Sequence, residues 1–212
     1  MLPAAAPATV SVPLNEARIL GVIPDYQTVT ETANVKIAPL SNREKLWLGV
    51  KESIDPFNMA NAVLAAGFSQ RGDQTTKYGE GWDSYGQRVG AALADFATQN
   101  LFSVSLACVL HQDPRYYRKG PGTRIPVRIL YSISRVVIAR HDGGGDEFNS
   151  SGIFGMVLGI GASNAYYPRA SIRGEVMAAR LETSLFGGVT GNLMSEFWPD
   201  IQKKFLHRKH TD

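Results

Sequence analysis

Residues 84–120, SYGQRVGAALADFATQNLFSVSLACVLHQDPRYYRKG, decide the fold that this sequence predicts. Ser84 and Gln87 have the spacing of a helix-capping box, and Pro114 lies just beyond the last position that suits a helix. Between them the stretch is apolar around most of its circumference, so the helix must be enclosed by other helices or by lipid. The sequence therefore predicts a central core helix that runs into the cluster at residues 111–120.

Composition favours closely packed helices or a position near lipid. Of the 212 residues, 19% are charged and 21 are Gly, whereas charged residues usually make up about a quarter of a globular chain. The net charge of +3 is a weak indication of anionic partners. The sequence contains no uninterrupted run of about 18 apolar residues, so it does not predict an ordinary membrane-spanning helix. The single cysteine, Cys108, excludes an intrachain disulfide and is expected to be a buried, inert thiol.

Capping signals and prolines divide the chain into three parts. Residues 1–40 are Pro-rich without a helical period, so they are predicted to form an extended arm. Residues 41–200 form the helical domain, and residues 201–212 form a basic tail beyond a stop near Pro199. The predicted helices cover residues 41–53, 56–70, 84–113, 124–140, 151–165 and 172–197. The expected fold is a single all-α domain of about six helices, with an extended N-terminal arm.

Glycines spaced four residues apart predict the faces through which these helices pack. The helix-packing candidates are Gly86 and Gly90, Gly155 and Gly159, and Gly187 and Gly191. Small residues at this spacing share one helix face and let two backbones approach. Because each Gly costs a helix about 1 kcal/mol relative to Ala, their repetition indicates close contacts. Membrane helices and a soluble bundle with close crossings both use this arrangement, so both alternatives stay open.

Aromatic and basic residues at the ends of apolar helices predict a binding surface. The candidate binding residues are Arg115, Tyr116, Tyr117, Arg118, Lys119, Arg124, Arg128, Arg135, Tyr166, Tyr167 and Trp198. Amphipathic rings beside cations suit the headgroup region of a membrane, and a basic amphipathic helix can lie on an anionic surface. The predicted partner is anionic lipid or a membrane protein complex, although a solvated charge stripe would look the same. Nucleic acid is disfavoured because no recognition fold accompanies the charge.

No catalytic, metal-binding or cofactor-binding motif stands out, so no cofactor and no metal are predicted and a non-enzymatic function is favoured. His111, Asp113 and His141 are the candidates for catalysis, as a His/Asp site in a periplasmic hydrolase. If two antiparallel helices carried the histidines, their rings would lie a helix length apart. A separation above roughly 10 Å would remove this alternative.

Seven ordered segments resemble an uncharacterised family of exported bacterial envelope proteins. They are RILGVIPDY at 18–26, DPF at 55–57, YGEG at 78–81, SYGQR at 84–88, HQDPRYYRKG at 111–120, SNAYYP at 163–168 and EFWPD at 196–200. The resemblance covers residues 17–206 and implies an exported protein located in the envelope, with no catalytic residues. Members of that family begin with a signal peptide, whereas residues 1–12 resemble only the small-residue end of one.

These observations predict a non-enzymatic structural or binding protein of the bacterial cell envelope, either periplasmic or membrane-associated. It is expected to contact a membrane or a membrane complex through the aromatic and basic residues. The periplasmic hydrolase is one alternative. The other is a soluble scaffold subunit whose glycine faces pack on copies of itself, which predicts a homo-oligomer that depends on concentration.

Overall fold

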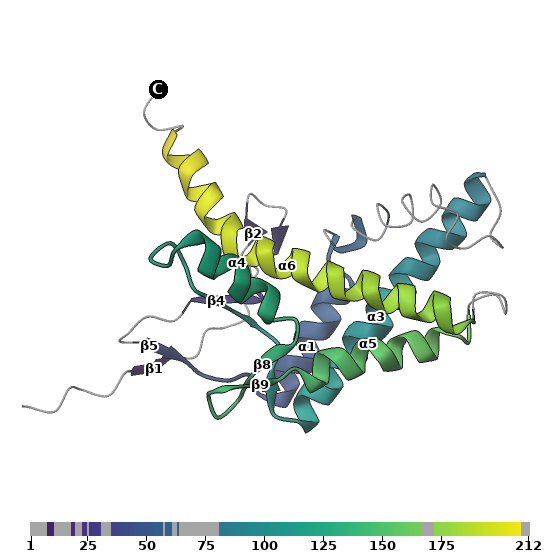
Figure 1. The fold of residues 1–212 in the computed structure, drawn as a ribbon, viewed down its shortest axis with the longest axis horizontal. Helices are drawn as coiled ribbons and strands as arrows, with labels where there is room; N and C mark the ends of the chain where they lie inside the picture. Colours follow the sequence, from purple (N-terminus) through teal and green to yellow (C-terminus); the bar gives the residue numbers. More distant parts are fainter. Residues whose placement is uncertain are drawn as a thin grey trace, which may run out of the picture.

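The computed structural model describes residues 8–10, 18–19, 23–24, 26–30, 35–56, 58–60, 63, 81–166 and 172–208 (Figure 1). This part of the chain is mostly helical and also contains several small sheets. The longer helices are α1 (Asn42–Ser53), α3 (Trp82–Val109), α4 (Ile125–Ser134), α5 (Ser150–Ser163) and α6 (Gly174–Arg208). The prediction of a purely all-α domain is therefore wrong, although the helix-rich class is confirmed.

The predicted start of the first helix is confirmed, and that of the central helix is wrong. At α1, Ser41 N donates to Glu44 Oε2 over 2.8 Å while Ser41 Oγ accepts from Glu44 N, which completes a capping box. The central helix α3 begins at Trp82, not at the expected Ser84 box. Gly81 is the N-cap, with a φ of 114° that L side chains rarely adopt, so the helix begins three residues before the position that a cap at Ser84 would give. Of the predicted helix at 56–70, residues 57, 61–62 and 64–70 lie outside the described residues; residues 56, 58–60 and 63 are helical.

The cluster after the central helix forms strands. Beyond α3 the chain turns at His111, which has a φ of 55°, and forms β6 (Gln112–Asp113) and β7 (Tyr116–Arg118). β6 pairs antiparallel with β8 (Ile138–His141), and β8 pairs with β9 (Asp146–Phe148). The predicted helix at 124–140 is thus too long, since α4 ends at Ser134. A turn at residues 135–137 follows, and β8 begins at Ile138; the three successive β-branched residues at 136–138 lower the helix propensity here.

The described part of residues 1–40 contains five short strands. β1 (Ala8–Val10) pairs with β5 (Val35–Ile37), and β2 (Arg18–Ile19) pairs with β3 (Ile23–Pro24). β4 (Thr28–Thr30) lies parallel to β7, which places this segment against the cluster at 111–120. Tyr26 and Val29 are buried there, and the Tyr26 hydroxyl donates to Asp55 Oδ2 over 3.2 Å.

Helix α3 packs against α1 and against α5. α5 contacts α3, and α6 contacts α5 and then α4 along its length (Figure 1). The predicted stop near Pro199 is wrong, because α6 continues to Arg208 and takes in much of the predicted basic tail. Arg118 Nε and Arg128 Nη2 both donate to the carbonyl oxygen of Glu196, over 2.8 and 2.7 Å. These side chains supply hydrogen bonds beside the proline, which itself has no N–H to donate.

Candidate functional site

Helix α4 has its polar side chains inside and its large apolar side chains outside. Arg128 and Ser132 are 4% and 0% exposed, and Arg135, one residue past the helix, is also buried. The outward residues of this segment are Ile125, Val127, Ile129, Leu130, Ile133 and Val137. Most of the predicted basic stripe therefore points into the molecule. Of its three arginines only Arg124 is exposed, and the apolar side of the helix takes the outward place.

Glu196 of α6 holds the inward face of α4 in place. Its side chain is 0% exposed and accepts a hydrogen bond from Arg128 Nε over 2.7 Å. Tyr116 Oη donates to the same carboxylate over 2.9 Å, and the backbone N–H groups of Lys119 and Gly120 donate over 3.0 Å each. A buried carboxylate with four donors is fully compensated, so this cluster fixes the orientation of α4 on α6.

Asp200, one helical turn further along α6, extends the same network. Arg128 Nη2 donates to Asp200 Oδ2 over 2.6 Å, and Arg118 Nη2 forms an ion pair with Asp200 Oδ1. Burial alone would raise the pKa of Asp200, but hydrogen bonds from the two arginines hold that pKa below its ordinary value. At the other end of α4, Arg135 Nη1 lies 2.6 Å from Asp146 Oδ1. All three inward arginines of this region therefore have carboxylate partners.

Arg115, Tyr116 and Tyr117, predicted to be binding residues, are buried inside the molecule. Arg115 Nε and Nη2 contact both oxygens of Asp113, at 2.9 and 2.6 Å, and Tyr117 Oη donates to Asp113 Oδ2 over 2.8 Å. Arg115 Nη2 also donates to the carbonyl oxygen of Ala38 over 2.7 Å. These three side chains serve as internal hydrogen-bond partners, on a segment whose strand β7 pairs with β4.

The remaining predicted binding residues differ in exposure. Lys119 is exposed, whereas Arg118 and Trp198 are half-buried. Tyr166 is 41% exposed, and its hydroxyl donates to Asp95 Oδ1 over 2.6 Å. Tyr167 lies outside the described residues.

The two candidate catalytic histidines lie close together, whereas the Asp113 carboxylate is hydrogen-bonded to other residues. The rings of His111 and His141 are stacked with their centroids 6.4 Å apart. The expected separation of a helix length is wrong, because β6 and β8 pair and set Gln112 opposite His141. The Asp113 carboxylate is occupied by Arg115 and Tyr117. The 6.4 Å between the rings is below the roughly 10 Å that would remove the hydrolase alternative, so that alternative stays a prediction, with Asp113 bound to Arg115 and Tyr117.

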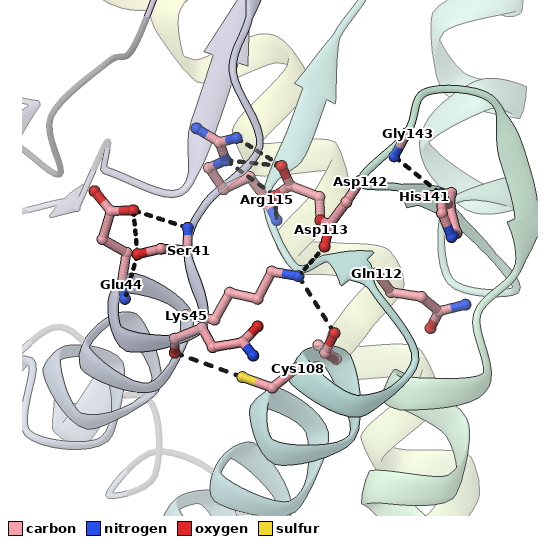
Figure 2. Close-up of polar contacts among 12 residues, drawn as sticks. Ser41, Glu44, Lys45, Cys108, Gln112, Asp113, Arg115, His141, Asp142 and Gly143 are labelled. Carbon is pink, nitrogen blue, oxygen red and sulfur yellow. Dashed lines mark hydrogen bonds and ion pairs between the residues drawn. The ribbon is translucent and has the colours of Figure 1, made fainter.

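An ion pair between Lys45 and Asp142 lies beside His141 in the chain (Figure 2). Lys45 of α1 is 0% exposed, and its Nζ lies 2.5 Å from Asp142 Oδ2 and 3.3 Å from the carbonyl oxygen of Ala107. Cys108 Sγ lies 3.5 Å from the carbonyl oxygen of Asn42. Burial raises the pKa of the Cys108 thiol, and Lys45 offsets this only in part. Such a thiol is a poor nucleophile, which agrees with a structural place for Cys108.

Helix α5 repeats the arrangement of α4 with small residues on its inner face. A Cβ atom at Gly155 would lie 2.6 Å from Ser103 Cα, and one at Gly159 would lie 2.7 Å from Gln99 Cα. The opposite face exposes Phe154, Val157 and Leu158, each about half exposed. This apolar face was not among the predictions from the sequence, although the i, i+3, i+4 spacing of its three residues was a readable signal.

Comparisons with protein-family models, with curated proteins and with solved structures gave no match for this chain.

The other two glycine pairs do not pack a helix in the described structure. Gly86, Gly90, Gly187 and Gly191 are exposed, and a Cβ at any of them would meet no described atom within 4 Å. Spacing alone does not distinguish these pairs from Gly155 and Gly159. A glycine pair packs a helix only where another helix crosses its face, and this depends on the tertiary structure.

Glu52, near the end of α1, gives the structure a testable pH dependence. Burial raises the pKa of its carboxyl from the ordinary 4.5 to about 7, and hydrogen bonds from Asn100 and Gln27 oppose this only in part. The folded chain therefore holds a proton that the unfolded chain releases, so the contribution of Glu52 to stability is greatest below about pH 4.5 and falls as the pH rises through about 7.

Glu52→Gln should remove this fall, because the amide stays neutral throughout. Thermal unfolding of both proteins between pH 4 and pH 8 would measure it, with the exposed Glu182→Gln as the control. The stability of Glu52→Gln relative to the unsubstituted protein should rise across that interval. Parallel pH curves for the two proteins would contradict the raised pKa.

Proposed function

We propose that this chain is a non-enzymatic structural or binding protein of the bacterial cell envelope that contacts a membrane through outward apolar helix faces. The observation that carries the proposal is the inverted packing of α5, which buries glycines against α3 and exposes Phe154, Val157 and Leu158. In water large apolar side chains are normally buried, whereas helices in lipid pack through small residues.

The neighbouring helices support the same proposal. Among the described residues, only α3 is long and apolar enough to cross a membrane, and just 11% of its apolar 18-residue window is buried. A core helix of a soluble protein would be mostly buried. Residues 96–110 of α3 and its end, 150–163 of α5 and 183–195 of α6 carry no charged side chain. Apart from the side of α3 that packs against α1, these segments present no charge to their surroundings.

A polar cluster bounds these segments at the end where Arg180 meets Asp95. Arg180 Nη2 lies 2.8 Å from both Asp95 oxygens and donates to Ser163 Oγ over 2.6 Å. The charge-free part of α3 is about 22 Å long at about 1.5 Å per residue, which is shorter than the hydrocarbon core of about 30 Å. This length favours burial in one leaflet or at its boundary over a complete crossing of the bilayer.

The experiment is flotation of the purified full chain with lipid vesicles. The triple variant Phe154→Ser, Val157→Ser, Leu158→Ser should lower vesicle partitioning on the order of 100-fold, since each apolar side chain contributes about 1 kcal/mol when its exposed half is covered. The matched control is Phe154→Leu, Val157→Leu, Leu158→Met, which keeps the face apolar and should float like the unsubstituted protein.

Circular dichroism of the same samples separates binding from folding, because the three positions are exposed and their helix content should not change. Equal flotation of the Ser variant and the control would contradict the assignment of the α5 face. Absence of the unsubstituted chain from vesicles of every composition would contradict membrane contact itself.

A further inference from the structure

The outward face of α4 is a second apolar surface, and it adjoins positive charge. Leu130 is 69% exposed and Ile125 is 62% exposed, with Ile133 on the same side. Lys119 and Arg124, just before the helix, are both exposed. No acidic residue occurs between Asp113 and Asp142 in the sequence. An apolar strip whose first turn adjoins exposed cations is the pattern of a helix that lies in a membrane surface.

We propose that α4 lies in the plane of an anionic membrane surface. Its apolar face enters the boundary between headgroups and acyl chains, and Lys119 and Arg124 contact headgroup phosphates. This inference rests on the proposed function, because it names the lipid class and the element that recognises it. With ten residues α4 is about 15 Å long, too short to cross a bilayer but long enough to lie along one.

The apolar face of α4 cannot turn inward, because ion pairs hold the opposite face. Arg128 is bound to both Glu196 and Asp200, at 2.7 and 2.6 Å. Ser132 Oγ lies 2.9 Å from Tyr116 Oη within the same cluster. Rotating the helix would expose its apolar side chains to these carboxylates and would leave the Arg128 charge without a partner. The outward direction of Leu130 and Ile133 is thus built into the fold.

Charge favours anionic lipid over a second copy of this chain as the occupant of the face. Among the described residues, Lys119 and Arg124 form no ion pair with a carboxylate, and Lys119 Nζ lies 4.7 Å from the centre of the Tyr131 ring. Two copies meeting through this same patch would bring like charges together at its edge. A bilayer containing anionic headgroups supplies both the apolar phase and the opposite charge.

The test compares two variants of the full chain on two kinds of vesicle, phosphatidylcholine alone and phosphatidylcholine with phosphatidylglycerol. Leu130→Ser with Ile133→Ser should weaken binding to both kinds on the order of 10-fold, since apolar insertion is lost. Lys119→Gln with Arg124→Gln should weaken binding to the anionic vesicles on the order of 10-fold and leave the neutral ones unchanged. The charge control, Lys36→Gln with Arg43→Gln, removes two exposed cations from β5 and α1 and should bind as the unsubstituted chain does.

Three results would overturn the inference, and they differ from one another. If the α5 Ser variant loses binding while both α4 variants bind fully, the membrane proposal stands and the α4 assignment fails. If Leu130→Ser with Ile133→Ser turns a dimer into a monomer in light scattering without changing vesicle binding, a second copy occupies the face. If the unsubstituted chain binds neither vesicle, the proposed function fails with the inference. Circular dichroism and the melting temperature of each variant should match those of the unsubstituted protein, because all substituted side chains are exposed.

Discussion

Glu196→Gln is expected to lower the free energy of unfolding by about 3 kcal/mol, because the buried Arg128 guanidinium keeps only Asp200 as a charged partner and the amide cannot accept from all the donors that the carboxylate binds. Glu196 is 0% exposed and accepts hydrogen bonds from Arg128, Tyr116 and two backbone N–H groups. The amide keeps the size of the side chain, but its NH₂ group would face donors. Urea unfolding followed by circular dichroism would measure the loss.

The control for this prediction is Glu182→Gln, an exposed carboxyl on the same helix. Its effect should stay within about 0.5 kcal/mol, as is usual for surface positions. Arg128→Gln should also destabilise, and the double variant should cost much less than the sum, because the two side chains interact directly. Additive effects, or equal stability of Glu196→Gln and Glu182→Gln, would show that this cluster does not fix α4 on α6.

Gly155→Ala is expected to destabilise the chain by about 1–3 kcal/mol, the typical cost of overpacking. The new Cβ would lie 2.6 Å from Ser103 Cα and from Ser103 N, so α5 and α3 would have to separate. Backbone atoms cannot move aside as a flexible side chain does. The cost should appear in the same urea experiment.

Gly187→Ala tests the same substitution where no helix crosses. A Cβ there would meet no described atom within 4 Å, and the position is exposed. Since Ala favours a helix over Gly by up to about 1 kcal/mol, this variant should be slightly more stable than the unsubstituted protein. The two substitutions thus have opposite expected signs. A gain in stability at both positions would mean that α5 and α3 do not approach as closely as the structure shows.

Local sequence signals predicted where the described helices lie better than they predicted what surrounds each helix. The capping box at Ser41 and Glu44 marked the start of α1 correctly, and apolar content indicated α3 and α5. Such signals act within a few residues, so one sequence suffices to read them. The end of α4 was missed because the β-branched residues after Ser134 continue an apolar period while favouring a strand.

The inward direction of the arginine stripe could not be read from the helix that carries it. Arg128 and Glu196 are 68 residues apart in the chain, and Asp200 is 72 residues from Arg128. The sequence did contain a partial signal, since Glu196 and Asp200 lie four residues apart on one face of α6. Without knowledge of which helices pack together, a charge stripe is equally consistent with solvent, lipid or an internal ion pair. The histidine pair was misjudged for the same reason, because the strand pairing of β6 with β8 depends on tertiary structure.

Helices α4 and α5 share one unusual arrangement, with apolar side chains on the outside. α4 and α5 bury groups that must be compensated, arginines in one and glycine backbones in the other, and leave their large apolar side chains outside. In water this arrangement forgoes hydrophobic stabilisation, at about 25 cal/mol for each Å² left exposed. Contact with lipid would recover it, which is why the proposed function places both faces against a membrane.

Fractionation of cells that naturally express the full chain tests this claim most directly. After lysis and a high-salt wash of the membranes, which removes proteins held by charge alone, immunoblotting would locate the chain. The apolar contacts of α4 and α5 predict that it stays in the membrane pellet and leaves it only in detergent. Complete recovery in the salt-washed soluble fraction would contradict the account.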